Sequence, residues 1–121
     1  MASILVIDDE APIRKMLKKL LERNGHNTLE AENGDQGLKV FKTDFPDLII
    51  TDLIMPDKEG IETILELKKL DPDVKIIAIS GGGVTEPEMY LDLARRFGAA
   101  RAFTKPVDNK TLINAVNELL A

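Results

Sequence analysis

The sequence predicts an α/β fold with a five-stranded parallel sheet covered by helices on both faces. Apolar runs with strand character alternate five times with segments of helical periodicity, and this alternation is typical of such a sheet. The run over residues 48–50 is continuously apolar, as expected for a central strand buried on both faces. A chain of 121 residues suits one core, so we expect a single domain over residues 1–121.

The first strand is predicted over residues 4–7, and the first helix follows Asp9. Pro12 fits the opening turn of this helix, and Gly25 fits its end because glycine takes the left-handed cap conformation easily. Residues 26–31 are short and polar enough to form an edge strand.

The second helix is predicted to open at Asn33-Gly34, and the third to cover residues 58–70. Pro72 ends the third helix, because the residue before a proline is pushed out of the helical region. A fourth strand over residues 76–79 precedes a helix with a capping box, Thr85 at the cap and Glu88 three residues later.

The fourth helix should end at Gly98, and the fifth strand includes residues 102–103. The fifth helix follows Asp108 and carries one apolar stripe at helical spacing, made of Leu112, Ala115, Val116, Leu119 and Leu120.

The composition excludes several classes of function. The chain has no cysteine, so it has no disulfides, no thiol catalysis and no cysteine-ligated metal, which fits the cytoplasm. A formal net charge of -5 argues against direct nucleic-acid binding, because phosphate backbones are bound by clustered Lys and Arg. No signal peptide or membrane span is present, so we expect no membrane contact.

Basic residues on the first predicted helix leave two interpretations open. Arg14, Lys15, Lys18 and Lys19 alternate with apolar residues at helical spacing. They fit an ordinary solvated helix face, which we favour, or a patch for an acidic partner.

Reactive side chains follow four of the predicted strands at the point where each ends: Asp8-Asp9, Asp52, Ser80 and Lys105. Because parallel strands gather their carboxyl ends at one edge of the sheet, these side chains should converge. Clustered carboxylates repel one another until a cation joins them, while Lys and Ser can hold phosphate oxygens. The set therefore predicts a divalent cation and phosphoryl chemistry on an aspartate.

This ordered set resembles the receiver domain of two-component response regulators over essentially the whole chain. The resemblance rests on Asp8-Asp9, the stretch Asp-Leu-Ile-Met-Pro-Asp-Lys-Glu-Gly at residues 52–60, Ser80-Gly81 and Lys105-Pro106. It implies a single receiver domain over residues 1–121, with the flavodoxin-like strand order 2-1-3-4-5. It also implies a cis bond between Lys105 and Pro106.

The resemblance also assigns a role to the phosphoacceptor and to the metal ligands. Asp52 would accept a phosphoryl group from a phosphohistidine on a sensor histidine kinase or phosphotransfer protein, or from a small phosphodonor. Mg²⁺ would be held by Asp9, assisted by Asp8, together with Asp52 and the backbone carbonyl of Ile54. Without the resemblance, Asp8-Asp9 could be a helix N-cap pair.

Lys105 and Ser80 are the remaining site residues that the resemblance implies. Lys105 would contact the phosphoryl group as a charged donor, and the hydroxyl of Ser80 would turn towards it and so report phosphorylation. The plainer alternatives are a solvated loop lysine and an ordinary turn serine.

The chain departs from the receiver pattern at one position. Many receivers carry Tyr or Phe three residues before the site lysine, and here that residue is Ala102. Phe103 cannot replace it, because neighbouring side chains of a strand point to opposite faces, and we expect Phe103 in the core. The departure concerns how the signal reaches a downstream protein target.

The sequence therefore favours a response regulator that catalyses only its own phosphorylation and dephosphorylation and signals through protein–protein interaction. One alternative is a receiver-like module that no longer depends on phosphorylation. Another is a receiver from a larger regulator or hybrid kinase. A phosphohydrolase is disfavoured, because such enzymes usually need an acid/base two residues after the nucleophile, where this chain has Ile54.

Overall fold

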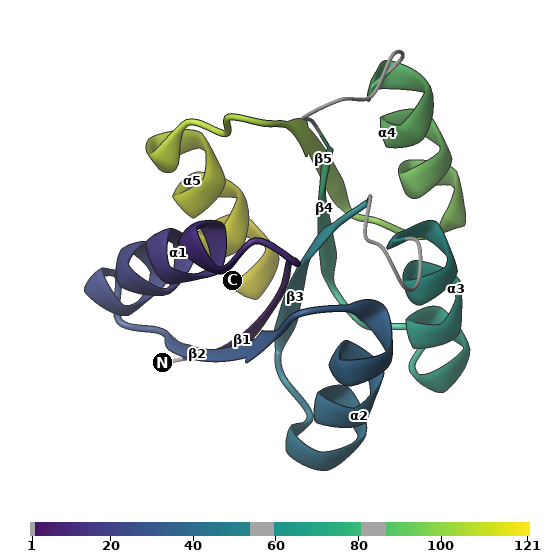
Figure 1. The fold of residues 1–121 in the computed structure, drawn as a ribbon, viewed down its shortest axis with the longest axis horizontal. Coiled ribbons are helices and arrows are strands. Elements are labelled where there is room, and N and C mark those ends of the chain that lie inside the picture. The colour runs from purple at the N-terminus through teal and green to yellow at the C-terminus, as the bar shows by residue number, and fades with distance from the viewer. Residues whose placement is uncertain (1, 54–59, 81–86) are drawn as a thin grey trace.

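The computed structural model describes the chain except for residue 1, residues 54–59, residues 81–86 and the side chains of residues 87–91. Strands and helices alternate along the chain (Figure 1). The strands are β1 (Ser3–Ile7), β2 (Asn27–Ala31), β3 (Leu48–Asp52), β4 (Ile76–Ser80) and β5 (Arg101–Thr104). The helices are α1 (Ala11–Arg23), α2 (Gly34–Asp44), α3 (Gly60–Leu70), α4 (Pro87–Phe97) and α5 (Asn109–Leu120).

The sheet is parallel with the order β2-β1-β3-β4-β5, which confirms the predicted fold. β2 lies at an edge as predicted and is only partly buried, whereas every residue of β3 and β4 is buried. In Figure 1, α1 and α5 cover one face of the sheet, and α2, α3 and α4 cover the other. This order brings the ends of β1 and β3 together in the middle of the sheet.

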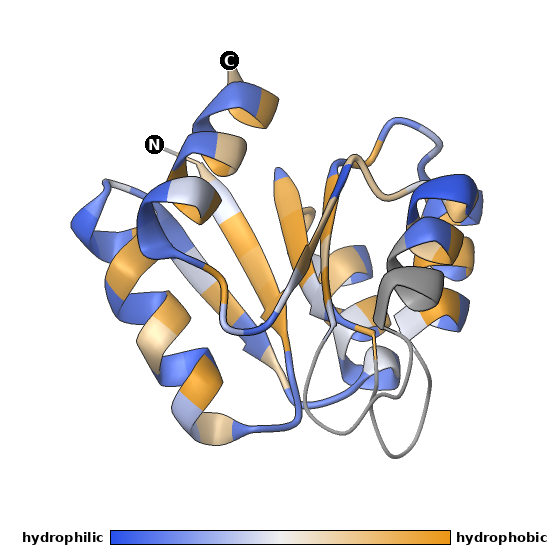
Figure 2. Ribbon diagram, turned by 90° about the horizontal axis from the view of Figure 1, so that it is seen from above, coloured by the Kyte–Doolittle hydropathy of each residue, from blue (hydrophilic) through white to orange (hydrophobic). Residues whose placement is uncertain are grey.

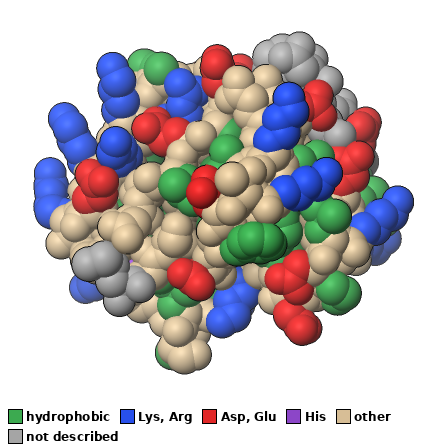
Figure 3. Space-filling view, turned by 90° about the horizontal axis from the view of Figure 1, so that it is seen from below, with side chains coloured by type: hydrophobic (Ala, Val, Ile, Leu, Met, Phe, Trp, Pro, Cys, Tyr) green, Lys and Arg blue, Asp and Glu red, His purple; other side chains and the backbone are tan. Residues whose placement is uncertain are grey.

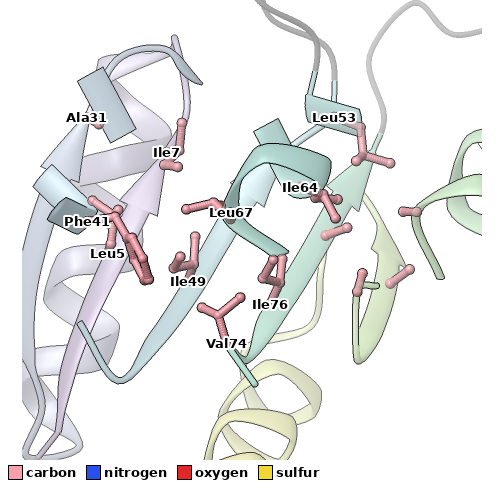
Figure 4. Packing of buried hydrophobic residues seen from close by; sticks show 14 residues of the cluster. Leu5, Ile7, Ala31, Phe41, Ile49, Leu53, Ile64, Leu67, Val74 and Ile76 are labelled. Atoms are coloured by element: carbon pink, nitrogen blue, oxygen red, sulfur yellow. The ribbon is translucent and has the colours of Figure 1, made fainter. Parts of the chain in front are cut away.

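The core consists of two layers, one on each face of the sheet. The layer beneath α2, α3 and α4 includes Leu5, Ile49 and Ile64, which Figure 4 shows with their neighbours. The layer beneath α1 and α5 includes Val6 and Val116. Figure 2 shows that the strands in the middle of the molecule are mostly hydrophobic, whereas the helices on both sides alternate hydrophobic and hydrophilic residues.

The ends of the helices follow local sequence signals. The Asn33 side chain accepts a hydrogen bond from Gln36 N at the start of α2, and Asp108 does the same for Thr111 N at the start of α5. Gly25 and Gly98 have φ angles of 86° and 127°, so both take the left-handed region as predicted for helix ends. The predicted capping residue Thr85 lies outside the described residues, as does the predicted start of α3 at residue 58.

On the face shown in Figure 3, acidic and basic side chains are interspersed, with small hydrophobic patches between them. This mixture lacks the single-sign field that a nucleic acid would need on that face. None of the helices in the described part of the chain is long and apolar enough to span a membrane.

Gly60 allows α3 to begin directly against the end of β3. Its N–H donates to Leu53 O at 2.8 Å. A Cβ at Gly60 would overlap the carbonyl oxygen of Asp52 and come within 2.5 Å of Leu53 Cα. Since these neighbours are backbone atoms, they can move only by displacing the end of the strand.

We therefore expect Gly60→Ala to destabilise the protein by about 1–3 kcal/mol, although alanine normally favours a helix. Gly37→Ala is the matched control, because there the three atoms nearest to the new Cβ all belong to the side chain of Ile7. Urea unfolding of the two variants provides the measurement. A loss no larger for Gly60→Ala than for Gly37→Ala would contradict this account of the packing.

Candidate functional site

The carboxyl ends of four strands bring the predicted side chains to one edge of the sheet. Asp8 follows β1, Asp52 ends β3, Ser80 ends β4 and Lys105 follows β5. The register places Asp52 beside Ile79, one residue before Ser80. Lys105 N donates to Ser80 O at 2.7 Å, which ties the end of β5 to the end of β4.

Lys105 joins the two buried carboxylates of the site. Its Nζ lies 3.1 Å from Oδ2 of Asp8 and 3.1 Å from Oδ2 of Asp52. Asp8 is only 3% exposed and Asp52 only 6% exposed. Buried charges are costly unless they are paired, so the ammonium group offsets the repulsion between the two acids. The bond between Lys105 and Pro106 is cis, as predicted.

The surroundings of Lys105 act on its pKa in opposite directions. Burial is the largest single influence and lowers the pKa, because it disfavours the charged form. The charges of Asp52 and Asp8 and their hydrogen bonds outweigh burial together, so the pKa of Lys105 is raised. Lys105 is therefore fully charged near neutral pH and is not a proton acceptor there.

Asp8, Asp9 and Glu10 form a group of carboxylates that fits a hard divalent cation. One oxygen atom from each lies within 4.8 Å of the others. Asp8 Oδ1 also accepts a hydrogen bond from Glu10 N at 2.9 Å. Asp9 is exposed, and within the described ranges its carboxylate accepts no hydrogen bond and forms no ion pair, which leaves it available to a cation.

The prediction of metal ligands matches this group only in part. Asp8 and Asp9 belong to it, whereas Asp52 is connected to Asp8 through Lys105. The predicted carbonyl ligand, Ile54, lies outside the described residues. Sequence reasoning missed Glu10, although its position next to Asp8-Asp9 could have indicated it. Glu10, not Asp8 or Asp9, takes the N-cap position of α1, and its side chain makes no capping hydrogen bond.

Ser80 places a buried hydroxyl group at the site. The residue is completely buried, and its Oγ has no partner among the residues that the structure describes. A buried polar atom without a partner is unusual, because leaving it unpaired costs free energy. Such a hydroxyl is suited to a ligand that arrives at the edge of the sheet.

The two residues before Thr104 confirm the predicted alternation of faces in β5. Ala102 packs in the core layer beneath α2, α3 and α4, whereas the partly buried Phe103 packs in the layer beneath α1 and α5. Arg95 of α4 reaches the Ala102 carbonyl oxygen with Nη2 at 3.5 Å, at the limit of a hydrogen bond. No aromatic ring therefore stands on the α4 side of β5 at this position.

Known proteins resemble this chain along almost its full length. Protein PilH of Pseudomonas aeruginosa is 36% identical over 100% of this chain and 99% of its own length. Chemotaxis protein CheY of Bacillus subtilis is 36% identical over 97% of this chain and 96% of its own. Sporulation initiation phosphotransferase F of the same bacterium is 32% identical over 97% and 92%, respectively.

A solved structure also resembles this chain along almost its full length. The response regulator receiver domain protein of Clostridium thermocellum superimposes with a TM-score of 0.90 at 36% identity, covering 98% of this chain and 94% of its own. The family described as response regulator receiver domain matches residues 4–117. Receiver domains bind Mg²⁺ at an acidic pocket and interact with histidine kinases and phosphotransfer proteins. The chain therefore belongs to the response regulator receiver domains, the signalling modules of two-component systems.

Proposed function

We propose that the protein accepts a phosphoryl group on Asp52 in a Mg²⁺-dependent reaction and signals by binding another protein. The observation that carries this proposal is the contact of Lys105 with both Asp52 and Asp8 at 3.1 Å. The contact pairs a buried carboxylate with an ammonium group at the edge of the sheet, beside the Ser80 hydroxyl, which has no partner among the described residues. An ionised carboxylate is the form that can attack phosphorus.

The reaction forms one bond and breaks one. An oxygen of Asp52 attacks the phosphorus of a phosphohistidine on a sensor histidine kinase or phosphotransfer protein. The P–N bond breaks, its electron pair stays on the imidazole, and Asp52 becomes an acyl phosphate. Lys105 then holds a phosphoryl oxygen in place of the Asp52 oxygen, and the Ser80 hydroxyl donates a hydrogen bond to another.

Asp8 and Asp9 would hold the cation together with Asp52 and the carbonyl of Ile54, which lies outside the described residues, and Glu10 adds a nearby carboxylate. When bound, Mg²⁺ neutralises charge that develops on the phosphoryl oxygens. Asp9 is suited to this role because it is exposed and its carboxylate accepts no hydrogen bond from the part of the chain that the structure describes.

The names of the relatives support phosphotransfer signalling but identify no pathway for this chain. One is called a chemotaxis protein and another a phosphotransferase of sporulation. We propose a cytoplasmic protein with residues 1–121 as a single receiver domain, a histidine kinase or phosphotransfer protein as donor, and a protein as downstream target. It would act on no substrate other than its own Asp52.

Ala102 supports one other candidate, a module that binds its partner without phosphorylation. With Ala102 on the α4 side of β5, this position offers no aromatic ring that could move and connect Ser80 to the surface. The paired acids and Lys105 favour the phosphoacceptor instead.

Incubation with acetyl phosphate and Mg²⁺ should add one phosphoryl group to the protein, as measured by intact mass. Asp52→Asn should remain unmodified, because the nucleophile is gone, and EDTA should prevent the reaction. Asp47→Asn is the matched control, since Asp47 lies just before β3 at the opposite end and should not affect labelling. Labelling of Asp52→Asn would contradict the proposal. So would a parent protein that no phosphohistidine donor can label.

The raised pKa of Lys105 predicts a pH dependence at alkaline pH. In NMR spectra of the folded protein the Lys105 side chain should titrate above its ordinary pKa, because the charges of Asp52 and Asp8 outweigh its burial. Its contribution to stability is complete below the unfolded value of about 10.4 and is lost as the pH rises through the folded value.

Above the unfolded pKa of about 10.4, the stability of the parent should therefore fall more steeply with pH than the stability of Lys105→Met. Lys110→Met, which removes an exposed lysine, should behave like the parent. Urea unfolding midpoints across the pH series measure the difference. Equal slopes for Lys105→Met and the parent would show that the ion pairs do not form as described.

A further inference from the structure

Arg14 on α1 connects the acid cluster to the edge strand of the sheet. Its Nη1 donates to the backbone carbonyl oxygen of Asp8 at 2.6 Å. Its Nε lies 3.5 Å from Oε1 of Glu30 on β2. The Arg14 side chain is only 15% exposed, so its contact with the Asp8 carbonyl is partly sheltered from water. A hydrogen bond from a charged donor is about twice as strong as one between neutral groups.

The Asp8 carbonyl belongs to the peptide that leads to Asp9. Because a peptide unit is planar, a bond that holds its oxygen also fixes the direction in which Asp9 leaves it. Asp8 is held on its other side as well, since its N–H donates to Ala31 O at 3.1 Å and its Oδ1 accepts from Glu10 N. Asp9 has no hydrogen bond of its own within the described ranges, so the position of its Cα atom depends on this peptide.

The Arg14–Glu30 ion pair contributes too little to the stability of the protein to account for the placement of Arg14. Glu30 is 35% exposed, and ion pairs near the surface typically contribute about 0–1 kcal/mol. Lys18, one turn further along α1, also reaches Glu30, at 3.9 Å. In the part of the chain that the structure describes, Arg14 contacts Asp8 and Lys18 does not. Replacing each in turn therefore separates an effect on the site from an effect on the ion pair with Glu30.

We propose that Arg14 is a positioning residue for the divalent cation: it holds the peptide between Asp8 and Asp9 so that both carboxylates face the cation, and Glu30 keeps Arg14 in place. This inference rests on the proposed function, because it concerns the same Mg²⁺ site. Partners that orient metal ligands typically change metal affinity about 10–100-fold when they are removed.

Mg²⁺ affinity of Arg14→Lys, Arg14→Met and Lys18→Met, measured by titration calorimetry, tests the inference. We expect both Arg14 variants to bind Mg²⁺ roughly tenfold more weakly than the parent. Arg14→Lys keeps the charge but lacks the rigid fork that reaches two acceptors at once. Lys18→Met removes a charge from the same helix and should bind Mg²⁺ as the parent does.

Two further readouts distinguish positioning from a general loss of structure. The carbonyl ¹³C resonance of Asp8 should move upfield in both Arg14 variants, because the carbonyl loses its donor, and should stay in place in Lys18→Met. In labelling by acetyl phosphate, the half-saturating Mg²⁺ concentration should rise about tenfold, while the rate at saturating Mg²⁺ stays near that of the parent. Urea unfolding reports the stability of each variant.

Parent-like Mg²⁺ affinity in Arg14→Lys would overturn the inference, because charge alone would then suffice. Equal effects of Arg14→Met and Lys18→Met would also overturn it. If Arg14→Met does not fold, Glu30→Gln provides the second variant. Parent-like Mg²⁺ affinity of Glu30→Gln would show that Glu30 does not keep Arg14 in place. If the parent neither binds Mg²⁺ nor accepts phosphate, the proposed function itself is contradicted. If the parent does both and the Arg14 variants behave like it, only this inference is contradicted.

Discussion

The ion pairs of Lys105 with Asp8 and Asp52 are the interaction on which the site depends. Two carboxylates that are almost completely buried would repel each other if no cation lay between them. Lys105 supplies that cation from a different strand, 53 residues after Asp52 and 97 after Asp8. Because the three residues lie at the carboxyl ends of β1, β3 and β5, the site exists only when the strands from β1 to β5 in the sheet order have paired.

The rest of the fold can be understood as support for this edge of the sheet. Gly60 lets α3 begin against the backbone of Asp52, and the Lys105 N–H binds the carbonyl of Ser80. Arg14 holds the Asp8 carbonyl from the side of α1. Each contact involves backbone atoms beside a reactive side chain, so it fixes position without using the chemical groups of the site.

The sheet and the gathering of the site could be predicted from the sequence, because both follow from periodicity and from the common direction of parallel strands. The continuous apolar run over residues 48–50 indicated a central strand, and the polar residues 26–31 indicated an edge. The contact of Arg14 with Asp8 could not be predicted, because side-chain direction at that range depends on how α1 packs. Glu10 was missed although it directly follows Asp8-Asp9 in the sequence, and the strand order came from the family resemblance.

The central claim is a cation site at this edge of the sheet. The measurement that tests it most directly is thermal unfolding of the parent and of Asp9→Asn, in EDTA and in saturating Mg²⁺. Carboxylate oxygens of Asp8, Asp9 and Glu10 lie within 4.8 Å of one another, so Asp9→Asn should melt higher than the parent in EDTA. Mg²⁺ at a hundred times its dissociation constant should stabilise the parent by about 2.7 kcal/mol and the variant far less. Glu22→Gln, which removes an exposed acid near the far end of α1, should respond as the parent does. An equal gain from Mg²⁺ in the parent and in Asp9→Asn would contradict a cation site at this edge of the sheet.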